Sequence, residues 1–220
     1  MMPAATPGVH WARLSQLDDD LARLQMGGMV AAVMPWIDGA AAQRAATLMV
    51  ARAGAPLQVM AVHDDLGAGP VVVWNETLRR LPHPWMLYCA QDAFAGRLWL
   101  RFALQALQRQ PGARLLAFND GKWFGELAAF GLVQRQWLDT LYGGALFHPG
   151  YAQHYGDTEL TLIARQQQVL AYHPHALLVE VDHGKDRKPV NPADRALFQR
   201  RAAEGFDHLV TDPLLRSIAA

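Results

Sequence analysis

The chain has 220 residues, of which 51% are hydrophobic, and its 20 Lys and Arg residues balance its 20 Asp and Glu residues. These values are typical of one globular domain with its own core, and they exclude a largely disordered chain. The zero net charge, without a basic block, argues against a nucleic-acid-binding protein. The single cysteine, Cys89, excludes an intrachain disulfide and is compatible with a reducing compartment. Because no apolar run reaches ~18 residues and no signal-peptide pattern is present, we expect a cytoplasmic protein without a transmembrane segment.

The N-terminal segment, residues 1–28, is predicted to be a helical extension. Four leucines follow a helical spacing between His10 and Gln25, namely Leu14, Leu17, Leu21 and Leu24. The pair Gly27-Gly28 would end this helix. The acids at 18–20 point in different directions around a helix, so we expect a solvated face there and not a metal site.

From residue 29 to about residue 190, apolar strands alternate with helices. We predict strands over 29–34, 57–62, 85–90, 115–118, 127–133 and 176–181. We predict helices over 40–53, 75–80, 97–108, 136–142 and 157–168, with Asn75 near the N-cap of its helix, and a C-terminal helix over 192–203 within a tail segment, 191–220. This alternation predicts an α/β fold with a mainly parallel sheet flanked by helices. In such sheets, ligands bind beyond the carboxyl ends of the strands.

Acidic residues stand at these strand ends. Asp64-Asp65, Asp92 and Asp182-His183 each follow a predicted strand, and Asp157 opens a predicted helix. Carboxylates and an imidazole that meet at one rim predict a site for a divalent cation and phosphate. Each residue alone also fits a structural role, in a turn, at a helix N-terminus or in a surface loop. The recurrence at the same end of successive strands favours the shared site.

Short motifs occur along the chain in a definite order. They are Val62-His63-Asp64-Asp65, Trp74-Asn75-Glu76-Thr77-Leu78, Tyr88-Cys89-Ala90-Gln91-Asp92, Gly131-Leu132-Val133-Gln134-Arg135, Tyr155-Gly156-Asp157-Thr158-Glu159-Leu160 and Val179-Glu180-Val181-Asp182-His183. In this order and spacing the chain resembles a family 2 glycosyltransferase with the GT-A fold, over roughly residues 29–185. The resemblance implies a GT-A-like catalytic domain over 29–190.

The resemblance implies a nucleoside-diphosphate sugar as donor and a hydroxyl acceptor, such as a glycan or glycolipid. Asp64 or Asp65 would hold the nucleobase and ribose, and Asn75 would start the helix beneath the donor and contribute to nucleotide binding. Lys185 would contact the diphosphate from a loop after the last strand. Lys185 could equally be a solvent-exposed surface charge without a role in binding.

The resemblance also implies the residues that perform the transfer. Asp92 and His183 would hold Mn²⁺ or Mg²⁺, and Asp157 would be the catalytic base of an inverting displacement. Among several aromatic candidates, Trp123 and Trp137 would line the acceptor pocket. Each aromatic residue could equally belong to the core.

The metal motif departs from the family pattern. Where the family has two carboxylates in a DxD motif, this chain has Gln91-Asp92-Ala93. One carboxylate can still hold Mg²⁺ when substrate phosphates complete the ligand set. An alternative is therefore a catalytically inactive nucleotide-sugar-binding protein, or a partner in a transferase complex. Other α/β nucleotide enzymes and serine hydrolases are disfavoured because the chain has no GxGxxG, GxxxxGK[ST] or GxSxG motif.

Overall fold

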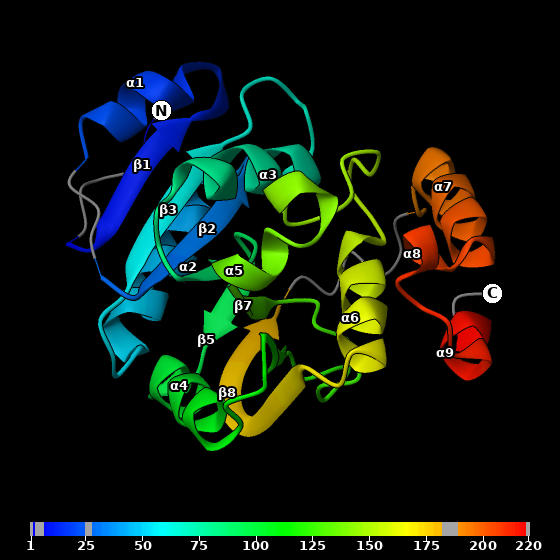
Figure 1. Ribbon diagram of the computed structural model, residues 1–220. Helices are drawn as coiled ribbons and strands as arrows, with labels where there is room; N and C mark the ends of the chain where they lie inside the picture. The colour runs from blue at the N-terminus through cyan, green and yellow to red at the C-terminus, as the bar shows by residue number, and fades with distance from the viewer. Residues whose placement is uncertain (1, 3–6, 25–27, 182–188, 219–220) are drawn as a thin grey trace.

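A computed structural model of the chain describes residues 2, 7–24, 28–181 and 189–218. Within these residues, eight strands form one sheet in the order β1-β3-β2-β4-β7-β6-β8-β5 (Figure 1). The strands are β1 (Val9–Arg13), β2 (Val30–Trp36), β3 (Gln58–His63), β4 (Trp85–Tyr88), β5 (Ala93–Ala95), β6 (Leu115–Asn119), β7 (Gly131–Gln134) and β8 (Leu170–Glu180). The pairs β1–β3, β2–β3, β2–β4 and β6–β8 are parallel, whereas β4–β7, β6–β7 and β5–β8 are antiparallel. The sheet is therefore mostly parallel, as predicted.

Helices cover both faces of the sheet. They are α1 (Leu17–Ala22), α2 (Gly39–Arg52), α3 (Pro70–Arg80), α4 (Trp99–Arg109), α5 (Arg135–Leu138), α6 (Gly156–Gln166), α7 (Pro192–Ala203), α8 (Gly205–His208) and α9 (Pro213–Ile218), with short 3₁₀ turns η1 (Leu14–Gln16) and η2 (Tyr142–Gly144). Helices α2 and α4 pack on one face, and α3 and α6 pack on the other. Within the described ranges, no helix has the length and apolar character that crossing a membrane requires.

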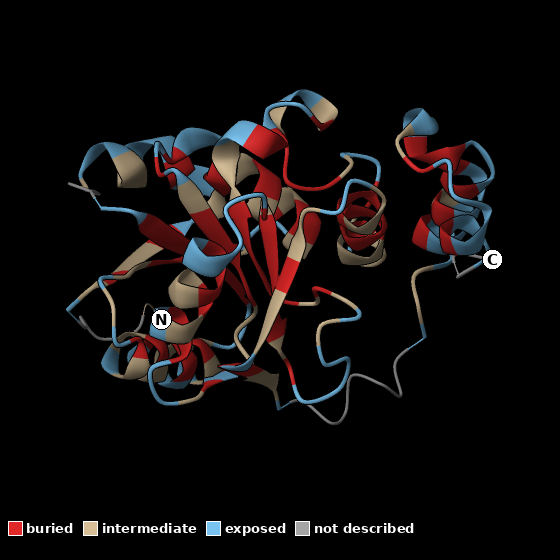
Figure 2. Cartoon of the chain, turned by 60° about the horizontal axis from the view of Figure 1, so that its bottom comes forward, coloured by how far each residue is buried: buried red, intermediate tan, exposed pale blue. Residues whose placement is uncertain are grey.

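The strand β2 illustrates why the interior forms as it does. All seven of its residues are buried, which is typical of a parallel strand between two helical layers. Val30, Ala32 and Met34 face the α2 side, whereas Ala31 and Val33 face the α3 side. Figure 2 shows the buried strands between these layers.

The N-terminal segment differs from its prediction. Residues Val9–Arg13 form β1, which extends the sheet parallel to β3, and the helix spans only Leu17–Ala22. The predicted helix over 10–25 is therefore wrong in its first part. The leucine spacing is a local signal, and the ladder of hydrogen bonds that an edge strand gains from β3 outweighs it.

The helix that contains Asn75 also starts earlier than predicted. Pro70 occupies the first turn of α3, where its fixed φ and missing N–H are tolerated. Asn75 is therefore in the middle of the helix, and the predicted N-cap position is wrong.

The C-terminal helices α7, α8 and α9 pack beside α6, at a distance from the sheet (Figure 1). The turn labelled α8 is left-handed, because Gly205, Phe206, Asp207 and His208 all have positive φ values. Such a conformation costs roughly 1–2 kcal/mol for each residue other than glycine. Burial of Phe206 stabilises the turn, and Asp207 forms an ion pair with Arg201 at 2.9 Å.

Candidate active site

Hydrogen bonds connect the ends of β3, β2 and β4 into one continuous rim. The backbone N–H of Asp64 donates to the carbonyl of Trp36 over 3.0 Å. The side-chain oxygen of Gln91 accepts from the two N–H groups of residues 37–38, at 2.8 and 2.9 Å. Asp92 follows Gln91 directly. Asp64 and Asp92, predicted to share a rim, therefore do lie on the same edge of the sheet.

Asp157 opens α6 beside this rim. Burial raises the pKa of Asp157 to about 6, the charge of Glu180 adds to the rise, and hydrogen bonds from Thr158 oppose it. Protein atoms surround the carboxyl group closely, although the residue keeps partial contact with solvent. A carboxylate with this pKa is suited to accept a proton near neutral pH.

The end of β8 connects Asp157 to Asp92. Glu180, the charge that raises the pKa of Asp157, pairs in register with Ala93 of β5. The next residue, Val181, donates its N–H to the carbonyl of Asp92 over 3.1 Å. The structure thus brings the predicted base, the predicted metal ligand and an unpredicted acid, Glu180, around one strand end.

A chain of three hydrogen bonds fixes the first turn of α6 to β4. The hydroxyl of Tyr88 donates to the carbonyl of Ala128 over 2.7 Å, and the N–H of Ala128 donates to the hydroxyl of Thr161 over 3.1 Å. Thr161 in turn donates to the carbonyl of Asp157 over 2.7 Å. Tyr88, Ala128 and Thr161 are all buried, which makes this connection rigid.

Asn75 stabilises the start of α6 indirectly, through Phe147. Its side-chain amide donates to the carbonyl of Phe147 and accepts from the N–H of Phe147, each over 3.0 Å. Phe147 packs against Gly156, the residue before Asp157. Asn75 is buried and uses its side-chain oxygen and nitrogen to bond Phe147, so its position does not support the predicted contact with the donor.

Asp65 and Trp137 also lie away from the rim. The carboxylate of Asp65 accepts from the N–H and the hydroxyl of Ser15, which ties the loop after β3 to η1. The ring of Trp137 is buried in the core, and its N–H donates to Gln167 over 2.8 Å. The predicted roles of Asp65 in donor binding and of Trp137 in acceptor binding are therefore not supported by their positions.

Trp123, in contrast, stays accessible near the rim. Asp120 accepts from the N–H groups of Lys122 and Trp123 at 2.9 and 2.8 Å and so shapes the loop after β6. The carbonyl of Asp120 accepts from Glu180 over 3.4 Å, which places this loop beside β8. With 43% of its surface exposed, Trp123 can contact a ligand.

The rim offers carboxylate oxygens that could bind a divalent cation. Among the residues that the structure describes, no three His, Cys, Asp or Glu side chains form a metal-binding group. His183 and Lys185 lie outside the described residues. The partly buried carboxylate of Asp92 suits Mg²⁺ or Mn²⁺, which take carboxylate ligands and complete their shell with substrate phosphates.

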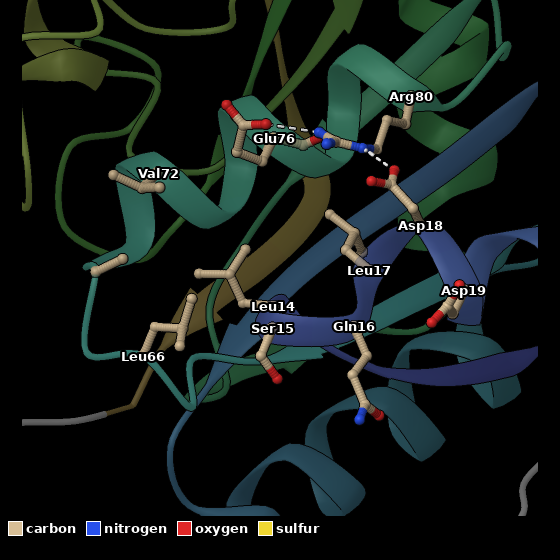
Figure 3. A pocket seen from close by; sticks show the side chains of 11 residues that line it. Leu14, Ser15, Gln16, Leu17, Asp18, Asp19, Leu66, Val72, Glu76 and Arg80 are labelled. Carbon is tan, nitrogen blue, oxygen red and sulfur yellow. Dashed lines mark hydrogen bonds and ion pairs between the residues drawn. The ribbon is translucent and has the colours of Figure 1, made fainter.

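A separate cavity of about 450 Å³ lies between η1, α1 and α3 (Figure 3). Arg80 spans its wall and pairs with Asp18 and Glu76 at 2.6 Å each. Neither Asp92 nor Asp157 lines this cavity. This cavity is therefore separate from the rim that carries Asp92 and Asp157.

Two residues at the site carried no predicted role although they stood inside the motifs. Tyr88 ends β4 and fixes α6, and Glu180 ends β8 beside Asp157. The signal for Glu180 was a charged residue within the otherwise apolar run Leu177-Leu178-Val179-Glu180-Val181. A buried or half-buried acid in such a run has to face a polar site.

Comparison with known proteins identifies the fold. Neither a protein-family model nor a curated protein sequence matches this chain. TarS from S. aureus, residues 1–349, aligns with a TM-score of 0.58 and 11% identity, over 83% of this chain and 68% of that one. The mannosyltransferase PcManGT from Pyrobaculum calidifontis, solved with GDP-Man and Mn²⁺, aligns with a TM-score of 0.58 and 14% identity, over 86% and 67% of the two chains.

A third structure covers nearly the whole chain. Glucosyl-3-phosphoglycerate synthase from Mycobacterium tuberculosis, solved with Mg²⁺ and UDP, aligns with a TM-score of 0.52 and 11% identity, over 97% of this chain and 87% of that one. These structures are nucleotide-sugar glycosyltransferases of the GT-A fold. The predicted fold class is thereby confirmed, and at these identities the likeness concerns the fold alone.

Proposed function

We propose that this chain transfers a sugar from a nucleoside-diphosphate sugar to a hydroxyl acceptor, with inversion at the anomeric carbon. The observation that carries the proposal is the carboxyl group of Asp157, with a pKa of about 6, beside Glu180 at the rim that also carries Asp64 and Asp92. The GT-A fold supports it, since solved structures with this fold hold GDP-Man and UDP.

In this mechanism Asp157 accepts the proton of the acceptor hydroxyl as the oxygen attacks the anomeric carbon. The new C–O bond forms as the bond to the diphosphate breaks, and the electron pair of that bond leaves with the diphosphate. Attack from the face opposite the leaving group inverts the configuration. The enclosed position of Asp157 keeps its basicity near that required at neutral pH.

The other predicted residues have supporting roles. Asp64 accepts two backbone N–H groups at 2.8 Å each, and a carboxylate has further lone pairs for a ribose or base. Asp92 and His183 would hold Mn²⁺ or Mg²⁺, which when bound stabilises the charge of the leaving diphosphate. Lys185 would contact the same phosphates, and Trp123 would stack on a glycan or glycolipid acceptor.

Binding without turnover is the second candidate. The observation that favours it is Gln91, which occupies the position where a DxD motif has a carboxylate and whose oxygen already accepts two N–H groups. In this case Asp92 would have no second carboxylate from the motif. The protein would then hold a nucleotide sugar for another transferase.

Two measurements separate these candidates. Calorimetric titration with UDP and GDP, each with and without Mn²⁺, tests for metal-dependent binding of the nucleotide. Incubation with a panel of nucleoside-diphosphate sugars, followed by detection of free nucleoside diphosphate, tests for turnover. Turnover that is lost in Asp157→Asn and kept in the surface control Asp19→Asn supports the transferase. Tight binding without turnover for every donor supports the second candidate.

A further inference from the structure

One face of α7 contacts the segment that leads into α6. Asp194, Phe198 and Arg201 are spaced at i, i+4 and i+7, so they lie on the same side of the helix. Each is buried, although two of them are charged. Buried charged residues need hydrogen-bond partners. Asp194 and Arg201 have such partners between residues 152 and 159, and the ring of Phe198 stacks on a residue of the same segment.

The first contact fixes the loop before α6. The carboxylate of Asp194 accepts three consecutive backbone N–H groups, from Ala152 at 3.0 Å and from Gln153 and His154 at 2.8 Å each. Three such bonds to one buried carboxylate hold the loop in a single conformation.

The second contact fixes the residue that caps α6. Tyr155 has a left-handed backbone, with a φ of 70°, and its ring stacks on Phe198 at 4.6 Å between ring centres. A left-handed tyrosine is strained, so its conformation depends on this stacking. Gly156 and Asp157 follow immediately.

The third contact holds α6 itself. Arg201 donates to the two carboxylate oxygens of Glu159, with Nη2 at 2.7 Å from Oε1 and Nε at 2.9 Å from Oε2. The hydroxyl of Tyr151 donates to the same carboxylate over 2.7 Å, and the hydroxyl of Tyr142 also donates to it. Only 1% of Glu159 and 6% of Arg201 is exposed. A buried, fully hydrogen-bonded pair of this kind has one geometry.

Glu159 and Asp157 lie on nearly opposite sides of α6, because two residues of an α-helix correspond to about 200° of rotation. Asp157 faces β4 and β8, and Glu159 faces α7. The hydrogen bonds to Glu159 therefore fix the orientation of α6, and with it the direction in which Asp157 points. We infer that Arg201 is a positioning residue for sugar transfer, which holds Glu159 so that Asp157 faces the acceptor hydroxyl. This inference rests on the proposed function.

The test compares Arg201→Gln and Arg201→Lys with two controls. Arg200→Gln changes an exposed arginine of the same helix, and Asp207→Asn removes the outer partner of Arg201 without changing Glu159. For each variant we would measure the folded fraction, kcat, the donor KM, and the titration of the Asp157 carboxyl by ¹³C NMR. Both Arg201 variants should lose about 10- to 100-fold in kcat, as a misplacement of about 1 Å would cause, with donor KM within twofold. The lysine, which keeps the charge, should retain more activity than the glutamine.

The carboxyl titration separates positioning from general stability. In the Arg201 variants Asp157 should titrate at lower pH than in the wild type, because a loosened α6 lets solvent reach the carboxyl. Wild-type kcat in a folded Arg201→Gln protein, or a loss that only follows the folded fraction, would overturn the inference. If Arg201→Gln does not fold, Arg201→Lys and Phe198→Leu decide by the same measurements. Absence of turnover in the wild type with every donor would instead refute the proposed function, and the titration of Asp157 would still decide whether Arg201 positions it.

Discussion

The ring of Phe147 lies directly against Gly156, the residue that precedes Asp157. A Cβ atom at position 156 would stand 2.7 Å from Cγ of Phe147 and 2.9 Å from its Cβ. No rotamer change relieves this contact, because the near atoms are at the base of the ring and Asn75 holds the backbone of Phe147. Gly156 is therefore required by close packing, and the start of α6 depends on it.

We expect Gly156→Ala to move the first turn of α6 away from Phe147. The displacement should lower kcat by about 10- to 100-fold and destabilise the fold by about 1–3 kcal/mol. Kinetic assays and urea denaturation measure the two effects. Gly112→Ala is the control, since nothing lies within 4 Å of a Cβ there. A Gly156→Ala enzyme with wild-type turnover would show that α6 tolerates the shift.

Asn75→Ala tests whether Asn75 supports the site or contacts the donor. Loss of the two bonds to Phe147 leaves buried polar groups without partners, so the free energy of unfolding should fall by about 1–3 kcal/mol. Donor affinity of the folded protein, measured by calorimetry, should stay within twofold. Arg79→Ala, an exposed change on the same helix, should alter neither quantity. A large loss of donor affinity at unchanged stability would instead show that Asn75 contacts the donor.

The features that could be predicted from sequence are those with a local signal. The runs at β2, β3 and β4 are apolar and short, and Asp157 opens its helix as expected. Their order along the chain was sufficient to indicate the GT-A fold. The strand β1 was missed because its stability comes from pairing with β3, which a window of sequence does not contain.

The side-chain roles were harder to predict because they depend on long-range partners. Asn75 and Phe147 are separated by 72 residues, and Arg201 and Glu159 by 42. Only the i, i+4, i+7 spacing of Asp194, Phe198 and Arg201, which places them on one face of α7, could have indicated a buried charge network. Residue type alone favours a pocket for Trp137, whereas its surroundings place it in the core.

Asp92→Ala tests the role of the single carboxylate in the motif. If Asp92 holds the cation, nucleotide affinity in the presence of Mn²⁺ should fall toward its value without the metal, by at least tenfold. Titration of UDP and GDP with and without Mn²⁺ measures this difference. Gln91→Ala is an informative comparison, because it removes the bonds to residues 37–38 and leaves the carboxylate in place. Equal metal dependence in Asp92→Ala and the wild type would exclude Asp92 as a ligand.

The pH dependence of turnover follows from the state of Asp157. A base must be deprotonated, and the pKa of this carboxyl is about 6 because the group is buried. We therefore expect kcat/KM to fall tenfold per pH unit below about pH 6 and to level off above it, because kcat/KM reports the pKa of the free enzyme. A pH profile of kcat/KM measures this dependence. A profile that stays flat down to pH 4 would show that a group other than Asp157 accepts the proton of the acceptor hydroxyl.

The same burial makes Asp157 costly for stability. Its folded pKa of about 6 lies above the ordinary value of 3.8, so its contribution is fully favourable below about pH 4 and is lost as the pH rises through 6. At pH 8 the wild type then carries a buried carboxylate that costs about 1–3 kcal/mol. In the Asp157→Asn variant the side chain is neutral at every pH, so the variant does not carry this cost.

The free energy of unfolding of Asp157→Asn, relative to that of the wild type, should therefore increase by about 1–3 kcal/mol between pH 4 and pH 8. Urea denaturation at both pH values measures the difference, and Asp19→Asn controls for the general effect of removing an acid. An unchanged difference at the two pH values would mean that Asp157 is charged at little cost. A growing difference would show that the ionised carboxylate, the form that the proposed proton transfer needs, lowers the stability of the fold.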